Sequence, residues 1–137
     1  MNIIWSDKLK TGIPAIDEQH QFIVEALSGV QVSKLKGAKL FELLINLQAY
    51  LSTHFDLEES YMKDTNYPEY AIHKANHDEV LQDTKNILTQ NNGNHSPSEV
   101  ALQFVKYMQR WFFEHYHNTD VKMTEYLKQN IDKINKS

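Results

Sequence analysis

Histidine and carboxylate side chains interrupt the apolar stripes of this sequence, and these interruptions constrain its fold more than any other feature. His54 and Glu58 are four residues apart, as are His73 and His77. Four residues advance an α-helix by slightly more than one turn, so the members of each pair project from the same face. The residues that precede His54 at steps of four and three are all leucine: Leu40, Leu44, Leu47 and Leu51. Both pairs are therefore expected to point into a helical core.

Two further segments place histidine inside an apolar stripe of the same spacing. His20 lies between Ile16 and Ile23, and His115 lies four residues after Trp111. Five of the seven histidines thus occupy core-facing positions, spread over four amphipathic segments. Lone buried polar groups cost kilocalories each, and ionised ones far more, so these side chains are expected to share a partner in the core.

Other polar residues are expected to play supporting roles. His95 lies in a loop of Asn, Gly and Ser, and His117 lies on a polar stripe. Glu59, like His117, is expected to face solvent. Asp17 is expected to cap a helix. Gln19 is expected to contact a metal ligand rather than to bind metal itself.

The length and the helical spacing predict one all-α domain. A chain of 137 residues, 41% of them hydrophobic, suits a single core. The sequence Ser96-Pro97-Ser98-Glu99 is typical of a helix start with a capping box. Short loops favour antiparallel neighbours, so an up-down-up-down four-helix bundle is expected over residues 14–117. The single domain is expected to span residues 1–137 and to begin with an extended N-terminal arm at 1–12. The helices of the bundle are expected at 14–36, 38–64, 69–90 and 97–117. A short terminal helix is expected at 119–134, within the terminal segment 119–137.

Composition excludes several classes of site and partner. The absence of cysteine excludes thiolate ligands, Cys nucleophiles and disulfides. A formal net charge of −4 argues against nucleic acid as a partner. No apolar run approaches the roughly 20 residues of a membrane span, and the N-terminus lacks the apolar core of a signal peptide. A cytoplasmic protein without membrane contact is therefore expected, and the sequence leaves its protein partners unknown.

A metal centre is the simplest partner for so many inward-facing ligands. The candidate ligands are His20, His54, Glu58, His73, His77, His115 and Asp120. Imidazole and carboxylate without thiolate favour iron, then manganese, then zinc. Seven side chains exceed the capacity of one ion, whereas two six-coordinate ions offer roughly twelve positions. If both carboxylates bridge and an oxo or hydroxo group bridges as well, about one position remains for a small ligand.

Asp120 fits the helical pattern least well. It follows His115 by five residues, which rotates it by about 140° on an ideal α-helix. Asp120 is expected to face the metals only if the helix ends near Asn118. Asn118 and Thr119 are residue types that favour such a break.

The ligand pattern resembles the motifs of the hemerythrin family. The matching fragments fall in order along nearly the whole chain: Gly12-Ile13-Pro14-Ala15-Ile16-Asp17-Glu18-Gln19-His20, His54-Phe55 with Glu58-Glu59 and Met62, His73-x3-His77, and Trp111-x3-His115-x4-Asp120. Each fragment is weakly specific alone, but together at these spacings they are highly specific. The chain resembles a single-domain, bacterial-type hemerythrin.

The resemblance implies an oxo- or hydroxo-bridged pair of iron ions that binds O2 reversibly. By the family pattern, His73, His77 and His115 hold one iron. His20 and His54 hold the other iron, which keeps the open position. Glu58 and Asp120 bridge the two ions.

The function that the resemblance implies is non-enzymatic O2 binding for storage, delivery or scavenging. One alternative is a sensor or regulator of O2, iron or nitric oxide. Another is an enzyme, such as a di-iron peroxidase or a nitric oxide reductase, and nitric oxide is then an alternative ligand.

Phe112 and Tyr116 depart from the family pattern, which commonly has aliphatic residues at these two positions. They are four residues apart and are expected to touch on one side of the last long helix. They are expected to tune a ligand pocket rather than to bind iron.

Overall fold

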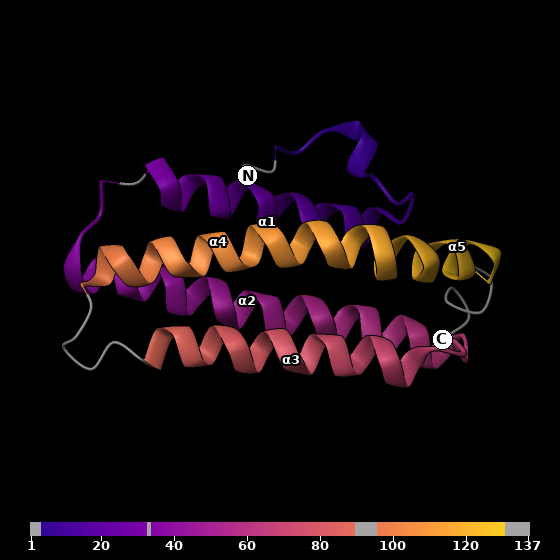
Figure 1. Ribbon diagram of the computed structural model, residues 1–137. Helices are drawn as coiled ribbons and strands as arrows, with labels where there is room; N and C mark the ends of the chain where they lie inside the picture. The colour runs from indigo at the N-terminus through magenta and orange to yellow at the C-terminus, as the bar shows by residue number, and fades with distance from the viewer. Residues whose placement is uncertain (1–3, 33, 90–95, 131–137) are drawn as a thin grey trace.

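The computed structural model describes residues 4–32, 34–89 and 96–130 of the chain. Its long helices are α1 (Pro14–Val32), α2 (Gly37–Asp64), α3 (Tyr70–Thr89) and α4 (Pro97–His115). The shorter elements are the 3-10 turn η1 (Asp7–Leu9), the π-helical turn η2 (Tyr116–Asp120) and α5 (Val121–Gln129). The four long helices lie side by side, and successive helices run in opposite directions (Figure 1). The predicted all-α, up-down-up-down bundle is confirmed.

The junction between α1 and α2 differs from the predicted one. Helix α1 ends at Val32 rather than at Lys36, because Lys36 has extended backbone angles and precedes the first turn of α2. Gly37 falls between the predicted helices at 14–36 and 38–64, but it opens α2, with a φ of +60°. Glycine adopts this left-handed conformation at little cost, which explains the residue type at this corner.

The interruption predicted between α2 and α3 is confirmed, and α5 is anchored to it. Asn66 has a φ of +56°, a conformation that asparagine tolerates better than most residues. The Tyr126 hydroxyl of α5 donates to the backbone oxygens of Thr65, at 2.5 Å, and Asn66, at 3.2 Å. These bonds hold α5 against the end of the bundle where α2 and α3 meet.

Two end segments also refine the prediction. The Ser96 half of the predicted capping box is confirmed, because the Glu99 backbone N–H donates to the Ser96 hydroxyl oxygen at 3.2 Å. The N-terminal arm is not wholly extended, because η1 forms a turn within it; Trp5 and Leu9 pack against the larger apolar cluster of the bundle. The terminal helix begins at Val121, and the remainder of its predicted range beyond residue 130 lies outside the described residues.

Within the part of the chain that the structure describes, the apolar core forms two clusters with a polar layer between them. The larger cluster includes Ile23 and Phe55, and the smaller one includes Ile16 and Met62. His20 lies between Ile16 and Ile23 on the buried face of α1. On α2 the buried face runs in the same way from Phe55 through Glu58 to Met62. The apolar clusters therefore fix the polar layer from both sides.

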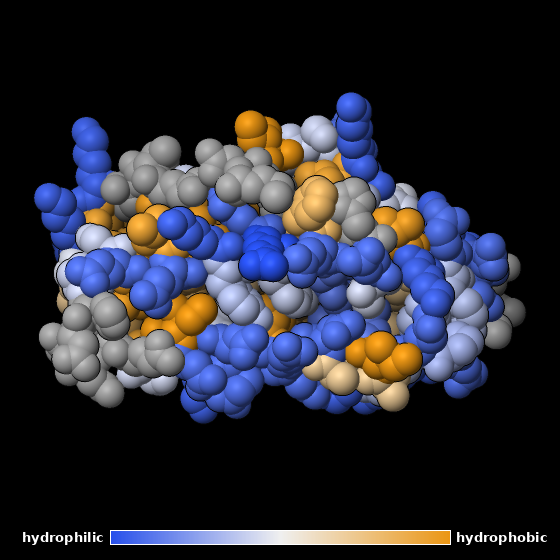
Figure 2. Space-filling view, viewed as in Figure 1, coloured by the Kyte–Doolittle hydropathy of each residue, from blue (hydrophilic) through white to orange (hydrophobic). Residues whose placement is uncertain are grey.

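Polar residues dominate the surface seen in Figure 2, with separate apolar patches between them. Exposed large hydrophobic residues include Phe22, Ile72 and Leu102. No helix in the described part of the chain combines the length and the apolar character that crossing a membrane requires.

Candidate metal centre

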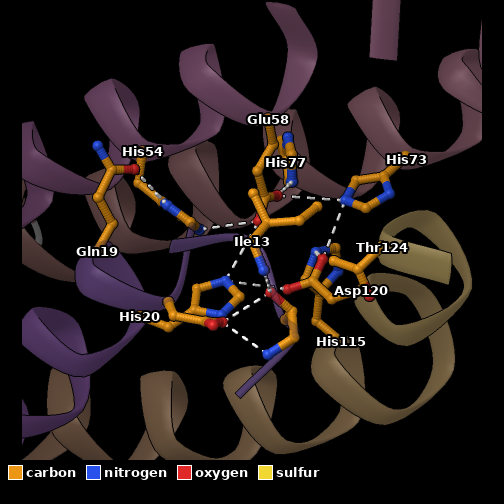
Figure 3. Close-up of polar contacts among 12 residues, drawn as sticks. Ile13, Gln19, His20, His54, Glu58, His73, His77, His115, Asp120 and Thr124 are labelled. Atoms are coloured by element: carbon orange, nitrogen blue, oxygen red, sulfur yellow. Dashed lines mark hydrogen bonds and ion pairs between the residues drawn. The ribbon is translucent and has the colours of Figure 1, made fainter. Parts of the chain in front are cut away.

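The structure brings all seven candidate ligands together inside the bundle (Figure 3). They come from five elements: His20 from α1, His54 and Glu58 from α2, His73 and His77 from α3, His115 from α4, and Asp120 from η2. None of these residues is more than 6% exposed. A buried layer of imidazoles and carboxylates therefore replaces apolar packing at this level of the bundle.

Three histidines gather around one oxygen of each carboxylate. His77 Nε2 lies 3.1 Å from Glu58 Oε1, and His73 Nε2 lies 3.5 Å from the same oxygen. His115 Nε2 lies 2.7 Å from Asp120 Oδ1, and His73 Nε2 lies 3.2 Å from that oxygen. We call these five residues the three-histidine group; their ligand atoms lie within 4.8 Å of one another.

The other two histidines gather around the second oxygen of each carboxylate. His54 Nε2 lies 3.1 Å, and His20 Nε2 3.2 Å, from Glu58 Oε2. His20 Nε2 also lies 3.3 Å from Asp120 Oδ2. We call His20, His54 and these two oxygens the two-histidine group. Glu58 and Asp120 thus lie between the groups and present one oxygen to each, the geometry of a carboxylate that bridges two ions (Figure 3).

Unpartnered atoms in the three-histidine group test whether metal fits there. The Nε2 atoms of His73, His77 and His115, with Glu58 Oε1 and Asp120 Oδ1, are buried and lie close together, but none of their contacts has the geometry of a hydrogen bond. Each such atom costs about 1–3 kcal/mol when left unsatisfied. A cation bound among the five atoms would satisfy them all. Their nitrogen and oxygen chemistry suits iron, manganese or zinc.

The electrostatics of the layer favour ionised carboxylates beside protonated imidazoles when no metal is bound. Burial lowers the pKa of His20, but Asp120 and Glu58 outweigh burial and raise it from 6.5 to about 10. The same balance raises the pKa of His73 to about 9. Burial prevails at His54, whose pKa is lowered.

The two carboxylates respond in the opposite direction. Burial raises the pKa of Glu58, but His54, His20 and His73 together lower it well below its usual range. Burial and Glu58 raise the pKa of Asp120, but His115 and His20 lower it well below its usual range. At neutral pH, a metal that enters the site would therefore displace protons from His20 and His73 rather than from the carboxylates.

A π-helical turn, rather than a helix break, directs Asp120 into the site. The predicted end of the helix near Asn118 is wrong, because the chain stays helical from α4 through η2 into α5. The Val121 N–H donates to the Tyr116 oxygen five residues earlier. In a π-turn the residue five positions on lies about one turn along the helix, so Asp120 comes to lie above His115.

Two ligand histidines have polar partners behind them. The His54 Nδ1 atom lies 2.8 Å from Gln19 Oε1, as the predicted supporting role of Gln19 requires. His77 Nδ1 lies 2.9 Å from Glu59 Oε2. Glu59 was expected to face solvent, and this expectation is wrong, because its side chain is only 13% exposed and contacts α3. Spacing within one helix could not reveal a contact between two helices.

Aromatic rings hold the imidazoles in place from the apolar side. The Phe55 ring stacks on His77, with centroids 4.0 Å apart and an interplanar angle of 8°. Trp111 stacks on His115, at 4.3 Å and 15°. Phe55 and Trp111, which the sequence identifies only as members of the family motifs, therefore also orient candidate ligands.

Phe112 and Tyr116 lie beside the two-histidine group and touch each other, as predicted. Their rings stack with centroids 6.1 Å apart, and the Phe112 ring lies 5.4 Å from that of His20. The Tyr116 hydroxyl donates to the Lys8 backbone oxygen at 3.4 Å. Tyr116 therefore ties the N-terminal arm to the bundle. The side chains of His95 and His117 lie outside the described residues.

Comparisons with known proteins show the family to which the chain is similar. The family model described as "Hemerythrin HHE cation binding domain" matches residues 11–127. A bacteriohemerythrin of Stenotrophomonas maltophilia (strain R551-3) is 26% identical over 134 residues, which cover 96% of this chain and 86% of the relative. A bacteriohemerythrin of Pseudomonas aeruginosa (strain LESB58) is 26% identical over 135 residues, or 97% of this chain and 86% of the relative. A hemerythrin-like protein of Naegleria gruberi is 24% identical over 118 residues, or 86% and 87%.

Proposed function

This chain belongs to the hemerythrin family, and we propose that it binds O2 reversibly at a pair of non-haem iron ions, as a bacterial-type hemerythrin. The observation that carries the proposal is the sharing of Glu58 and Asp120 between two histidine groups. One ion would need only one oxygen from each carboxylate. Here the second oxygen of each carboxylate lies beside further imidazoles, as two ions would require. The proposed role is O2 storage, delivery or scavenging rather than catalysis.

In this proposal the two groups have different capacities. The three-histidine group offers three imidazoles and two carboxylate oxygens, and a bridging oxygen would complete roughly six positions. The two-histidine group, His20 and His54 with the other two oxygens, offers one ligand fewer. A vacant position would therefore belong to an iron held by His20 and His54.

The iron ions supply the electrons and the open position that O2 binding requires. The chain supplies the surroundings. Phe112, which is only 3% exposed, and Tyr116, which is 6% exposed, cover His20 with apolar rings. Such a covering would keep bulk water away from an iron bound by His20. Gln19 accepts a hydrogen bond from His54 Nδ1, and so fixes the ring tautomer that leaves Nε2 free for metal.

Optical spectra of the reduced, iron-loaded protein test the function directly. We expect a new absorption band on adding O2, and we expect it to disappear when O2 is removed under inert gas. A band that cannot be reversed, or no band, would contradict reversible binding. Steady consumption of a reductant in the presence of O2, peroxide or nitric oxide would instead identify an enzyme.

A further inference from the structure

The two histidine groups differ in the charge behind their ligands. His54 Nδ1 meets the neutral amide of Gln19, whereas His77 Nδ1 meets the carboxylate of Glu59. In both cases the oxygen accepts, so the ring nitrogen donates and Nε2 is free to bind metal. The distances are nearly equal, at 2.8 and 2.9 Å. What distinguishes the pairs is therefore charge rather than geometry.

The surroundings preserve most of the Glu59 charge at His77. The His77 side chain is completely buried and stacks on Phe55, and Glu59 is only 13% exposed, so water screens the bond between His77 and Glu59 weakly. Lys74 lies 3.7 Å from the other Glu59 oxygen, but it is 42% exposed and is 3.0 Å from Asp78. An exposed ammonium shared between two carboxylates neutralises Glu59 only in part.

A carboxylate behind a ligand histidine raises the basicity of the ring and its strength as a metal ligand. A stronger donor stabilises a trivalent ion more than a divalent one. We propose that Glu59 is a positioning residue that acts through His77 to stabilise the ferric state of the iron in the three-histidine group. Among the described residues, the hydrogen-bond partner behind His54 is the neutral Gln19 amide, so an iron held by His20 and His54 would stay ferrous more readily.

This inference rests on the proposed function, because it assumes that the site holds iron. It adds a division of labour between the two ions. The iron with a complete ligand set gives up its electron more easily, and the iron with the vacant position retains its electron longer. The couple concerned is a one-electron change, Fe(III) + e⁻ → Fe(II), in which no protein bond is broken.

A potentiometric titration of the iron-loaded protein tests the role of Glu59, with electrons supplied by an electrode through small mediators. Glu59→Gln keeps the shape and removes the charge, so we expect the lower of the two midpoint potentials to rise. A tenfold change in the ferric-to-ferrous ratio corresponds to about 59 mV for one electron. Mössbauer spectra of the half-reduced protein would show whether the ferric ion is the one bound by three histidines.

Matched variants separate a local effect from a general effect of charge. Asp56→Asn removes an exposed charge from α2, three residues before Glu59, and should leave both potentials unchanged. Gln19→Glu places a carboxylate behind His54 and should lower the higher potential. Gln19→Glu also keeps the test decisive if Glu59→Gln loses iron.

Zinc-loaded protein gives a readout that needs neither iron redox chemistry nor O2. The His77 Nδ1 proton should resonate further upfield in Glu59→Gln, because an amide accepts a weaker hydrogen bond than a carboxylate, and should not move in Asp56→Asn. If the wild type binds O2 reversibly and Glu59→Gln has the same midpoint potentials as Asp56→Asn, the inference is overturned and the proposed function stands. A wild-type protein that takes up no iron overturns the proposed function and the inference together.

Discussion

The proposed vacant position depends on His54, one of only two imidazoles in the two-histidine group. We expect His54→Ala to abolish stable O2 binding, because the iron with the vacant position would lose a ligand. The hydrogen bond to Gln19 that orients this ligand would be lost as well. The measurement is the optical band of the reduced protein under O2. His117→Ala is the matched control, because His117 falls on a polar stripe in the sequence. Equal loss of the band in both variants would count against the assignment.

Phe112 should control water entry without holding iron. Its ring lies 5.4 Å from that of His20, and its replacement by leucine leaves space beside the proposed vacant position. We expect Phe112→Leu to retain the iron content of the wild type and to autoxidise faster, as measured by stopped-flow decay of the O2 band.

Tyr116→Phe is the matched control for this aromatic pair. It keeps the stacked ring and removes only the hydroxyl that donates to Lys8 on the arm. The lifetime of the O2 band should stay close to that of the wild type. A large change in Tyr116→Phe with none in Phe112→Leu would mean that the hydroxyl, rather than the ring, governs the site.

At the scale of elements, the first turn of α1 is anchored by Asp17. Its carboxylate accepts from the Thr11 N–H at 2.6 Å, from the Thr11 hydroxyl at 2.7 Å and from the Gly12 N–H at 3.1 Å. Hydrogen bonds to a charged group contribute about 1.5–3 kcal/mol, less where water competes. We expect Asp17→Ala to lower the free energy of unfolding in urea by about 1–3 kcal/mol with unchanged iron content. Glu18→Ala, at an exposed neighbour, should cost much less.

The sequence predicts the long helices and six of the seven candidate ligands because both follow α-helical spacing. It fails where the backbone leaves that spacing. Asp120 fits only a five-residue step, and a π-turn has no simple signature in side-chain periodicity. The resemblance to a family, rather than the spacing, supports Asp120 before the structure is known. The corner at Gly37 fails for a similar reason, because one glycine can end one helix or open the next.

At the scale of the whole molecule, the bundle holds a polar layer that apolar packing alone does not stabilise. Removal of iron should therefore lower the thermal midpoint at neutral pH. Bound metal stabilises the folded state by mass action, and the unpartnered atoms of His73, His77 and His115 lose their ligand without it. Calorimetry of the iron-loaded and iron-free proteins measures the difference. Coinciding midpoints would show that iron is not part of the folded core.

The iron-free protein should also respond to pH in a specific direction. The folded pKa values of His20 and His73 are raised to about 10 and about 9, so the folded state binds these protons more tightly than the unfolded chain. Their contribution is complete below pH 6.5 and is lost as pH rises through 9 to 10. The free energy of unfolding in urea should fall over this range. The free energy of unfolding of the iron-loaded protein should fall less over the same pH range, because imidazoles bound to iron do not carry these protons.

Contacts between helices are what the sequence could not supply at this scale. Spacing places Glu58 and His20 on inward faces, but it does not bring the two to 3.2 Å across the bundle. It likewise leaves Glu59 beside a ligand without showing that Glu59 reaches His77 on α3. Packing of separate helices decides these pairs, and only a folded structure contains that information.

Iron content per chain is the measurement that tests the central claim most directly. The claim is that seven side chains from five elements form a site for two ions. Elemental analysis after anaerobic reconstitution with ferrous iron, combined with native mass spectrometry, should give close to two irons per chain in the wild type. One tightly bound zinc with no iron, or a single iron that saturates the site, would contradict the claim.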